Sequence, residues 1–273
     1  MKFAIVVVLY QKKIQQLPFF SWLGEIFASK IPIYCYDNSP IAQDFPTSPW
    51  FIYQHDPRNL GVTAGYNFAY QQLQGKDYDG LLLLDQDTQL SLAYLKELQQ
   101  LVIAPNVFAV VPKIFAGSQQ ISPVKSADYI NRNAQALTSG CYAQEVMAIN
   151  SGSLLRFSFL TKIGGFNPEF PLDFSDHWLF YALHKQQGEV LVLDTKLEHQ
   201  LSVLDYTTMS HGRYQQILAA EKLFYTRYRR DLLRTHCWQL FKRSAKQLVK
   251  VRDLYFAKTT FFAGLTLLWG GTK

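Results

Sequence analysis

The stretch Leu81-Leu82-Leu83-Leu84-Asp85-Gln86-Asp87-Thr88 is a short apolar run that ends in two carboxylates one residue apart. Four consecutive leucines are typical of a strand that is covered on both faces, as in the middle of an α/β sheet. Asp85 and Asp87 then lie at the carboxyl end of that strand, where such sheets bind ligands. Oxygen ligands there suit a hard divalent cation, which can neutralise a diphosphate. An acidic turn after a strand is the alternative interpretation of this motif alone.

Length and composition indicate one large α/β domain with an appendage. The chain has 273 residues, 48% of them hydrophobic and 18% charged, which is enough to bury a sizeable core. The apolar start, residues 3–9, is followed by polar residues without a cleavage site, so we interpret it as the first strand rather than a signal peptide. No segment reaches the ~18 apolar residues of a membrane-spanning helix, although residues 259–270 are apolar enough to be interfacial. Cys35, Cys141 and Cys237 lack metal-ligand spacing, and we expect them to be reduced cytosolic thiols.

The positive charge of the chain is concentrated near its carboxyl end. Between Glu221 and Lys258 eleven Lys and Arg residues face three acids, a balance of about +8, whereas the whole chain carries +6 and the remainder about −2. These cations alternate with Leu, Phe, Tyr and Trp238 and without Pro or Gly, which indicates basic amphipathic helix. Such helices bind anionic membrane surfaces, with roughly 1 kcal/mol of attraction per nearby cation. The alternative is a solvated face of a packed helix; no nucleic-acid module accompanies the charge, so nucleic acid is not an expected partner.

Strand and helix patterns alternate along the first half of the chain. We predict strands at residues 3–9, 31–36, 51–54, 80–84 and 107–111, and a further strand within 144–155. Helical patterns are found at residues 19–28, 64–73 and 157–163, and Ser91 can cap a helix that begins at Leu92. Residues 118–138 are polar and irregular. The alternation predicts a sheet of mostly parallel strands flanked by helices.

Two other polar segments follow predicted strands and would meet the acidic pair at the same edge. Asp37-Asn38-Ser39 follows the second strand, where a carboxylate can accept hydrogen bonds from a base or a ribose hydroxyl. The segment from Arg58 to Asn67 combines a cation, a polar turn and two glycines at a helix start, where backbone amides can meet a phosphate. Its spacing matches neither the dinucleotide fingerprint nor the phosphate loop, which argues against nicotinamide oxidoreductases and ordinary nucleoside triphosphatases.

In this order the motifs resemble glycosyltransferase family 2, the inverting enzymes of GT-A fold that use nucleotide sugars. The resemblance covers Phe3 to about Ser202. Its parts are the first strand Ile5-Val-Val-Val-Leu-Tyr10, the turn Asp37-Asn38-Ser39, the segment Asn59 to Asn67, the Asp85-Gln86-Asp87 pattern, and Asn150-Ser-Gly152-Ser-Leu-Leu-Arg156 leading to Gly164-Gly165-Phe166. The form Leu84-Asp85-Gln86-Asp87-Thr88 looks most like the rhamnosyltransferase branch, which builds bacterial surface polysaccharides.

The resemblance implies a GT-A-like mixed, mostly parallel sheet in residues 1–215. The basic run predicts a carboxyl-terminal amphipathic helical membrane-association region in residues 216–273. The resemblance also implies a divalent metal, Mg²⁺ or Mn²⁺, bound by Asp87 and His199, with Asp85 as a further candidate ligand. The residues implied in binding the donor are Tyr10, Asp37, Asn38, Arg58, Asn59, Gly65, Asn67 and Asp85.

On the acceptor side, the segment Phe170 to Leu179 occupies the position of the family's acidic motif. By resemblance, Asp176 is the general base that takes the proton of the acceptor hydroxyl. Many relatives carry an acidic residue immediately before this position or two residues after it, where this chain has Ser175 and Trp178. That departure leaves Asp173 as a rival base. The residues implied in binding the acceptor are Gly152, His177 and Trp178.

Together these features predict an inverting glycosyltransferase. The donor would be a dTDP- or UDP-linked sugar, with L-rhamnose suggested by the narrower resemblance. The acceptor would be a polyprenyl-diphosphate-linked saccharide, met by a peripheral enzyme at the cytoplasmic face of the plasma membrane. Two alternatives stay open: a nucleotidyltransferase, which also needs acidic metal ligands, and a catalytically silent membrane-associated scaffold that retains the fold.

Overall fold

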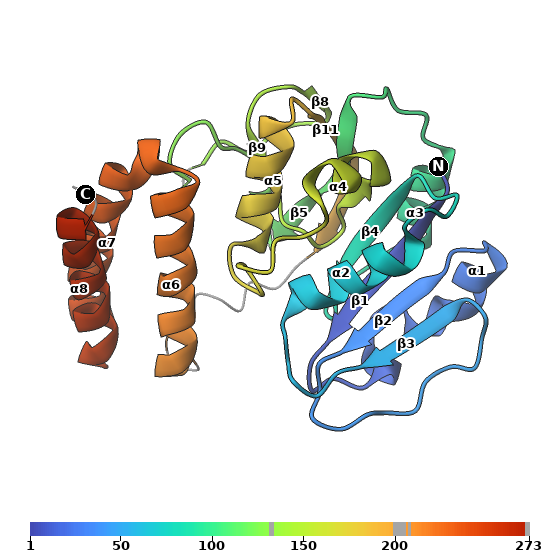
Figure 1. The fold of residues 1–273 in the computed structure, drawn as a ribbon, viewed down its shortest axis with the longest axis horizontal. Coiled ribbons are helices and arrows are strands. Elements are labelled where there is room, and N and C mark those ends of the chain that lie inside the picture. Colours follow the sequence, from blue (N-terminus) through green and yellow to red (C-terminus); the bar gives the residue numbers. More distant parts are fainter. Residues whose placement is uncertain (131–133, 199–205, 207–208, 271–273) are drawn as a thin grey trace. The chain divides into compact units, whose positions relative to one another are not determined.

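The computed structural model describes residues 1–130, 134–198, 206 and 209–270. The chain forms two compact units, whose elements are labelled in Figure 1. The sheet unit comprises Met1–Lys125 and Ala134–Gln200, and the helical unit comprises Ser126–Asn133 and Leu201–Lys273. The division therefore precedes the expected boundary at 215/216, which falls inside helix α6 (His211–Arg227).

The sheet unit contains a mixed, mostly parallel sheet with the strand order β3-β2-β1-β4-β10-β5-β11-β8, in which β6 also pairs with β5. Its strands are β1 (Phe3–Leu9), β2 (Ile33–Asp37), β3 (Phe51–His55), β4 (Gly80–Asp85), β5 (Val107–Ala116), β6 (Gln119–Ser122), β8 (Gly140–Tyr142), β10 (Leu154–Arg156) and β11 (Glu189–Glu198). Strands β1 to β4 pair in parallel, as do β5 and β11, whereas β10 runs antiparallel to both of its neighbours. This arrangement confirms the predicted fold class.

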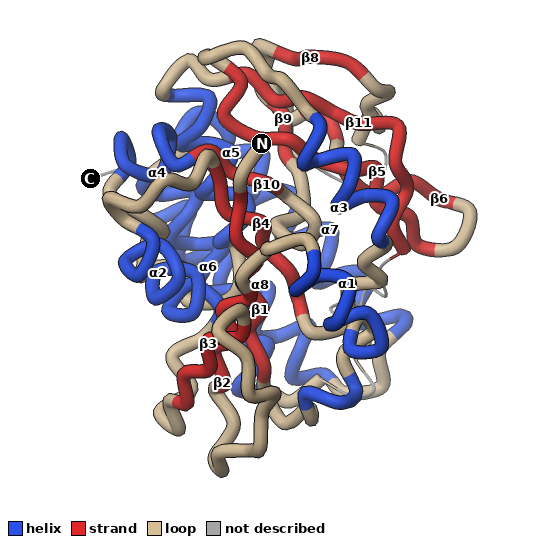
Figure 2. The backbone as a smooth tube through the Cα atoms, turned by 90° about the vertical axis from the view of Figure 1, so that its right-hand side faces the viewer, coloured by secondary structure: helices blue, strands red, loops and turns tan. Residues whose placement is uncertain are grey.

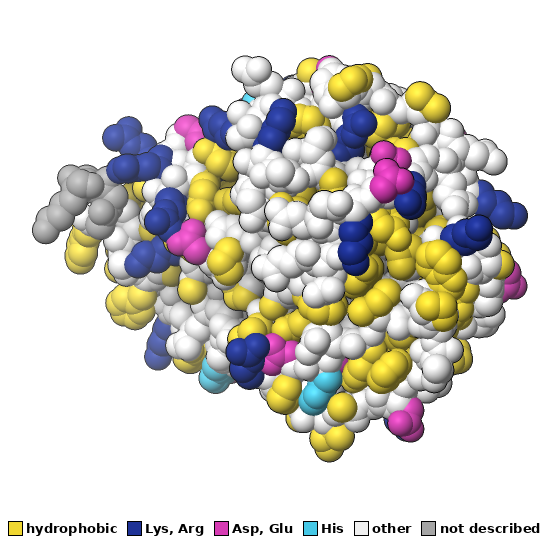
Figure 3. All heavy atoms as spheres, turned by 45° about the vertical axis from the view of Figure 1, so that its right-hand side comes forward, with side chains coloured by type: hydrophobic (Ala, Val, Ile, Leu, Met, Phe, Trp, Pro, Cys, Tyr) yellow, Lys and Arg dark blue, Asp and Glu magenta, His cyan; other side chains and the backbone are white. Residues whose placement is uncertain are grey.

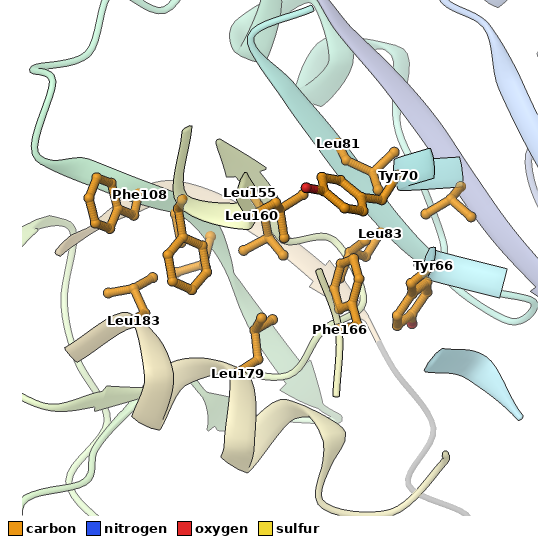
Figure 4. Close-up of a cluster of buried hydrophobic side chains, with 14 of the residues drawn as sticks. Tyr66, Tyr70, Leu81, Leu83, Phe108, Leu155, Leu160, Phe166, Leu179 and Leu183 are labelled. Atoms are coloured by element: carbon orange, nitrogen blue, oxygen red, sulfur yellow. The ribbon is translucent and has the colours of Figure 1, made fainter. Parts of the chain in front are cut away.

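Helices cover both faces of the sheet (Figure 2). Side chains of α2 (Val62–Leu73), α4 (Phe157–Ile163) and α5 (Ser175–Lys185) pack in one buried cluster, and those of α1 (Leu23–Ala28) and α3 (Leu92–Gln100) in the other. Leu81 and Leu83 of β4 point into the first cluster (Figure 4), and Leu82 and Leu84 into the second. Because successive strand side chains face opposite sides, a strand covered on both faces needs an unbroken apolar run. Each of these fully buried leucines contributes about 1.5–3 kcal/mol to folding.

Most predicted elements are present, and two segments differ. The Ser91 hydroxyl accepts a hydrogen bond from the amide of Tyr94 at 3.1 Å and caps α3, as expected. A single strand within 144–155 was wrong: β9 (Val146–Met147) and β10 are separated by a turn at Gly152, whose φ of +82° breaks the extended backbone. Residues 118–138 contain β6 and β7 (Val124–Lys125), which pair with β5 and β9. β6 forms a hairpin with the preceding β5, whereas β7 pairs with β9 farther along the chain, and strands this short leave little periodic signal.

Gly65 lets α2 approach the sheet closely. A Cβ atom at this position would lie 2.5 Å from Cγ2 of Val8 and 2.9 Å from Cβ of Tyr36. We expect Gly65→Ala to lower the free energy of unfolding by about 1–3 kcal/mol, because the added methyl overpacks this contact. Urea unfolding followed by circular dichroism measures the change. Gly24→Ala in α1 is the control, since nothing lies within 4 Å of its would-be Cβ; equal stability of the two variants would refute the packing role.

The helical unit contains α6, α7 (Leu233–Lys250) and α8 (Leu254–Gly270), and the basic run of the sequence is divided among them. Their shared core is formed by Tyr214, Leu218, Cys237, Leu240, Phe256 and Leu267. Inside the unit Arg243 donates two hydrogen bonds, of 3.1 and 2.9 Å, to the buried carboxylate of Glu221. Over the described residues, none of the helices combines the length and apolarity needed to cross a membrane.

The segment Ser126–Asn133 interrupts the sheet unit in sequence and belongs to the helical unit. Arg229 donates hydrogen bonds to the carbonyl oxygens of Ser126 and Ala127, at 3.2 and 3.1 Å. The Tyr129 hydroxyl lies 3.1 Å from Nδ1 of the buried His236. The helical unit is thus assembled from two separate stretches of the chain.

Candidate active site

The carboxyl ends of β1, β2, β3 and β4 form one edge of the sheet. In the strand register Asp85 pairs with Val8, Leu9 pairs with Asp37, and Asp37 pairs with His55. The last residues of β2 and β4 are therefore carboxylates at the same edge, separated by β1. This is the position at which parallel sheets bind ligands, and it agrees with the sequence prediction.

Ser151 fixes the end of β4. Its buried hydroxyl accepts a hydrogen bond from the amide of Asp85 at 3.1 Å and makes a second hydrogen bond with the hydroxyl of Thr88. The next residue, Gly152, donates its amide to the Leu83 carbonyl at 2.8 Å. These contacts anchor both ends of the turn that carries Asp85 and Asp87, so its backbone is held before any ligand binds.

Gln86, between the two aspartates, ties the turn to the end of β1. Its side-chain oxygen accepts the amide of Tyr10 at 2.9 Å, and its backbone carbonyl accepts Nζ of Lys12 at the same distance. Lys12 therefore places a positive charge beside the acidic pair. Lys12 was not among the predicted site residues.

Tyr66 of α2 lies beside the carboxylate at the end of β4. Its hydroxyl lies 3.4 Å from Oδ1 of Asp85, and the side chain is fully buried. Burial raises the pKa of Tyr66 well above its usual range, and the negative charges of Asp85 and Asp176 raise it further. The negative charges of Asp85, at the end of β4, and of the predicted base Asp176 thus both act on the buried Tyr66 hydroxyl. The sequence analysis did not single out Tyr66.

Asp176 lies in the first turn of α5, two residues after Phe174. Its Oδ1 accepts the amide of His177 at 2.8 Å. Phe174 adopts a left-handed conformation with φ of +61°, and its ring stacks on His177 with 4.4 Å between centroids. Asp173 precedes Phe174 and Asp176 follows it, so this left-handed residue separates the two candidate bases. Asp176 is the one whose charge acts on Tyr66.

The segment before α5 is fastened to the start of α2. Thr63 donates its hydroxyl to the Phe170 carbonyl at 2.6 Å and its amide to the Pro171 carbonyl at 3.2 Å. At Gly61, with φ of +83°, a Cβ atom would lie 2.2 Å from the same Pro171 oxygen. Because only glycine fits this contact, Gly61 and Thr63 determine where α5 begins relative to the sheet edge.

Three predicted donor-binding residues have their side chains engaged by the protein. The amide group of Asn67 exchanges two 2.8 Å hydrogen bonds with the backbone of Phe166. The Asn38 side chain bonds the Leu60 amide and the Gly61 carbonyl, both at 3.1 Å. Arg58 forms a two-pronged ion pair with Asp56, at 2.8 and 2.6 Å, which lowers the pKa of that carboxyl. The contacts of Asn38 and Arg58 shape the loop between β3 and α2, and those of Asn67 join α2 to the backbone of Phe166.

Asp37 is buried at the end of β2 and is fully hydrogen-bonded. Oδ1 accepts the amide of Ser39 at 2.9 Å, and Oδ2 accepts Nε2 of Gln43 at 2.8 Å and the hydroxyl of Tyr53 at 2.7 Å. Burial alone would raise the pKa of Asp37, but hydrogen bonds from Ser39, Gln43 and Tyr53 outweigh it, and the pKa is lowered. Asp37 is therefore a charged acceptor held in one orientation by Ser39, which belongs to the predicted turn, and by Gln43 and Tyr53, which were not among the predicted site residues.

The remaining predicted residues lie in different surroundings. Tyr10 is exposed just beyond β1, and Asn59 is exposed with φ of +52°. Trp178 is half-buried and packs against the apolar cluster beneath α5, beside the half-buried His177. Gly65 is buried against the sheet, as described above. His199 lies outside the described residues.

The acidic pair suits a metal that shares its ligands with a substrate. Over the described part of the chain there is no group of three or more His, Cys, Asp or Glu side chains that could hold an ion by itself. Mg²⁺ typically uses one or two protein carboxylates and completes its octahedron with waters and substrate phosphates. Asp85 and the exposed Asp87 supply such a carboxylate pair at an open sheet edge.

Comparison with known proteins gives no match by sequence, either to a family model or to a curated protein. Solved structures do match. GalNAc-T7, solved with UDP, GalNAc and Mn²⁺, aligns at a TM-score of 0.60 and 13% identity over 97% of this chain. Only 55% of the GalNAc-T7 chain is covered, so this chain spans about half of that protein.

Residues 1–349 of TarS from S. aureus align at a TM-score of 0.50 and 12% identity, covering 99% of this chain and 92% of that one. The same protein in complex with UDP-GlcNAc aligns at a TM-score of 0.53 and 10% identity, over 99% of this chain and 73% of that one. These neighbours are GT-A-type structures, and their sheets and flanking helices match the arrangement described above. The chain therefore has the GT-A fold.

Proposed function

We propose that this protein is a metal-dependent, inverting glycosyltransferase of the family 2 type, which uses a nucleoside-diphosphate sugar. One observation carries the proposal: within a GT-A fold, the carboxylates of Asp37 and Asp85 end strands β2 and β4 at one edge of the sheet, where the buried Tyr66 hydroxyl lies 3.4 Å from Asp85. Sugar transfer needs one acidic site for the donor's diphosphate and one base for the acceptor hydroxyl. The sheet edge supplies the first and α5 supplies the second.

On the donor side, Asp87 and Asp85 would hold a divalent metal, Mg²⁺ or Mn²⁺. When bound, this metal would neutralise the charge that develops on the leaving diphosphate. Lys12, hydrogen-bonded to the Gln86 carbonyl, adds positive charge at the same turn. Asp37 would position the end of β2 at the nucleoside side of the site, since its buried carboxylate already accepts hydrogen bonds from Ser39, Gln43 and Tyr53. In GalNAc-T7, UDP, GalNAc and Mn²⁺ occur together, which supports the assignment by fold.

On the acceptor side, Asp176 takes the proton from the attacking hydroxyl. The hydroxyl attacks the anomeric carbon from the face opposite the diphosphate, so the configuration at that carbon inverts. The contacts of Gly61 and Thr63 with Pro171 hold the segment that carries this base. Trp178 and His177, next along α5, would then contact the acceptor sugar.

The finer assignment follows from the sequence resemblance. We propose L-rhamnose, carried by a dTDP-linked donor, as the transferred sugar, because Leu84-Asp85-Gln86-Asp87-Thr88 looks most like the rhamnosyltransferase branch. The proposed acceptor is a polyprenyl-diphosphate-linked saccharide of bacterial surface polysaccharide synthesis, reached from the cytoplasmic face of the plasma membrane.

Product analysis tests the reaction class. Purified protein with Mn²⁺ and dTDP-rhamnose, UDP-glucose or UDP-galactose should release nucleoside diphosphate. The release should be slow when water accepts the sugar and faster when a saccharide-lipid acceptor is added. Omission of the metal should abolish the release. Pyrophosphate as the product would instead identify a nucleotidyltransferase. Absence of both donor binding and turnover with every donor would support the catalytically silent scaffold.

A further inference from the structure

The outward face of α7 combines cations with exposed apolar side chains. Arg234, Trp238, Lys242, Ala245 and Val249 recur at the spacing that places residues on one side of a helix. All five are exposed, and Trp238 and Val249 expose 67% and 86% of their surface. The opposite side of α7 packs into the core of the helical unit. The exposed tryptophan is thus a feature of the surface and contributes little to that core.

The outward face of α8 is almost entirely apolar. Leu254, Phe261 and Phe262 expose 51%, 43% and 62% of their surface, and Lys258 lies between them on the same side of the helix. Large apolar side chains gathered on one exposed face indicate an interaction site, whereas scattered ones need no explanation. The described part of α8 does not combine the length and apolarity needed to cross a bilayer, and exposed apolar side chains along one side of a helix suit a contact made along that side.

The two outward faces join into one surface. Ring centroids of Trp238 and Phe241 lie 6.2 Å apart, those of Phe241 and Phe261 lie 5.4 Å apart, and those of Phe261 and Phe262 lie 5.9 Å apart. Gly264 permits this closeness, since a Cβ atom there would lie 3.1 Å from the Phe241 ring. We call this chain of rings, with its flanking cations, the aromatic surface. In Figure 3, Lys and Arg side chains lie among hydrophobic ones at the left.

We infer that the aromatic surface docks on an anionic phospholipid bilayer. Trp238, Phe261 and Phe262 enter the boundary between headgroups and acyl chains, and Arg234, Lys242 and Lys258 meet the lipid phosphates. Aromatic rings favour this boundary, and nearby cations add attraction to an anionic leaflet. Both helices then lie in the plane of the membrane rather than across it.

The charge of the surface argues against a second copy of the chain as its occupant. Residues 233–270 contain seven Lys and Arg residues and a single acid, Asp253. A symmetric dimer places the same patch of both subunits face to face, so cations would meet cations. An anionic bilayer satisfies the cations and the aromatic rings together. The inference goes beyond the proposed reaction, because the aromatic surface contains none of the residues assigned to sugar transfer.

Vesicle co-sedimentation of the full chain tests this inference. The probe is a vesicle of equal parts phosphatidylcholine and phosphatidylglycerol, compared with pure phosphatidylcholine. Wild type should bind the anionic vesicles, with a blue shift of its tryptophan fluorescence. Arg234→Gln/Lys242→Gln/Lys258→Gln should weaken binding roughly 100-fold at low salt, at about fivefold per cation. Trp238→Ser/Phe262→Ser should weaken it at least about tenfold and reduce the fluorescence shift.

Two control variants lie in the sheet unit. Lys30→Gln/Lys76→Gln/Lys185→Gln removes the same charge from exposed positions, and Val102→Ser removes an apolar side chain that is 98% exposed. Both should bind as wild type does. The inference is overturned if wild type fails to bind anionic vesicles or if the two aromatic-surface variants bind unchanged. It is also overturned if wild type is a dimer by sedimentation velocity that Trp238→Ser/Phe262→Ser dissociates. Circular dichroism melting verifies that each variant is folded. The cation variant changes only exposed side chains, so it still tests the inference if the aromatic variant unfolds.

Nucleoside diphosphate release with a water-soluble acceptor, measured on the same variants, separates the two proposals. A variant that binds anionic vesicles less strongly but still releases nucleoside diphosphate supports the inference. If no protein turns over any donor while wild type binds anionic vesicles, the proposed reaction fails and the inference stands.

Discussion

Asp87→Ala should lower metal-dependent sugar transfer by roughly 10³-fold or more, because removing a metal ligand forfeits several kcal/mol of charge stabilisation on the leaving diphosphate. The fold should be unaffected, since Asp87 is exposed beyond the end of β4 and contributes nothing to either buried cluster. The measurement is the initial rate of nucleoside diphosphate release as a function of Mn²⁺ concentration.

Asp77→Ala is the matched control for this variant. Asp77 precedes β4 and Asp87 follows it, so the same charge is removed at opposite ends of one strand. Asp77 has a side chain that is 98% exposed and pairs only with Lys2 among the ion pairs of the described residues. It should retain wild-type activity and metal dependence. Should the two variants respond alike to Mn²⁺, Asp87 is not a ligand.

Asp176→Asn should reduce turnover by roughly 10²-fold or more with donor affinity nearly unchanged, because an amide cannot accept the acceptor's proton. The substitution is conservative, since the asparagine oxygen can still accept the amide of His177. Steady-state kinetics give the turnover, and calorimetric titration with the nucleotide sugar gives the affinity.

Asp173→Asn, on the other side of the backbone reversal at Phe174, should have the smaller effect. The reversed order would make Asp173 the base. A comparable loss of donor affinity in Asp176→Asn would indicate that this carboxylate binds the donor instead of activating the acceptor.

The parts of the fold that depend on local pattern could be predicted from the sequence. The leucines at positions 81–84 predicted a strand that is buried on both faces, and the structure contains it as β4. The polar residues that end the predicted strands indicated which side chains lie at the edge of the sheet. The predicted strand over 144–155 failed because the turn at Gly152 depends on contacts with β4 that lie about 70 residues away along the chain.

The positions of the site residues required contacts that no local pattern carries. The Tyr66 hydroxyl approaches Asp85, and Gly61 lies against Pro171, and in each pair the two residues are too far apart in the sequence to share one motif. Likewise, the partners of Asp37 come from two segments with no motif of their own. Arg58 differs, since its ion pair with Asp56 spans only two residues and could have been inferred from that spacing.

The excursion of Ser126–Asn133 out of the sheet unit has a practical consequence for truncation experiments. Cutting the chain at Tyr228 would remove Arg229 and His236, the partners of Ser126, Ala127 and Tyr129, and would strip the apolar side of α6. The product would retain the segment that begins at Ser126 without its hydrogen-bond partners and would expose the apolar side of α6. It would be prone to aggregate for reasons unrelated to catalysis or to lipid binding. Point substitutions leave both stretches of the discontinuous helical unit in place. They are therefore the suitable way to separate its contribution to membrane binding from its contribution to folding.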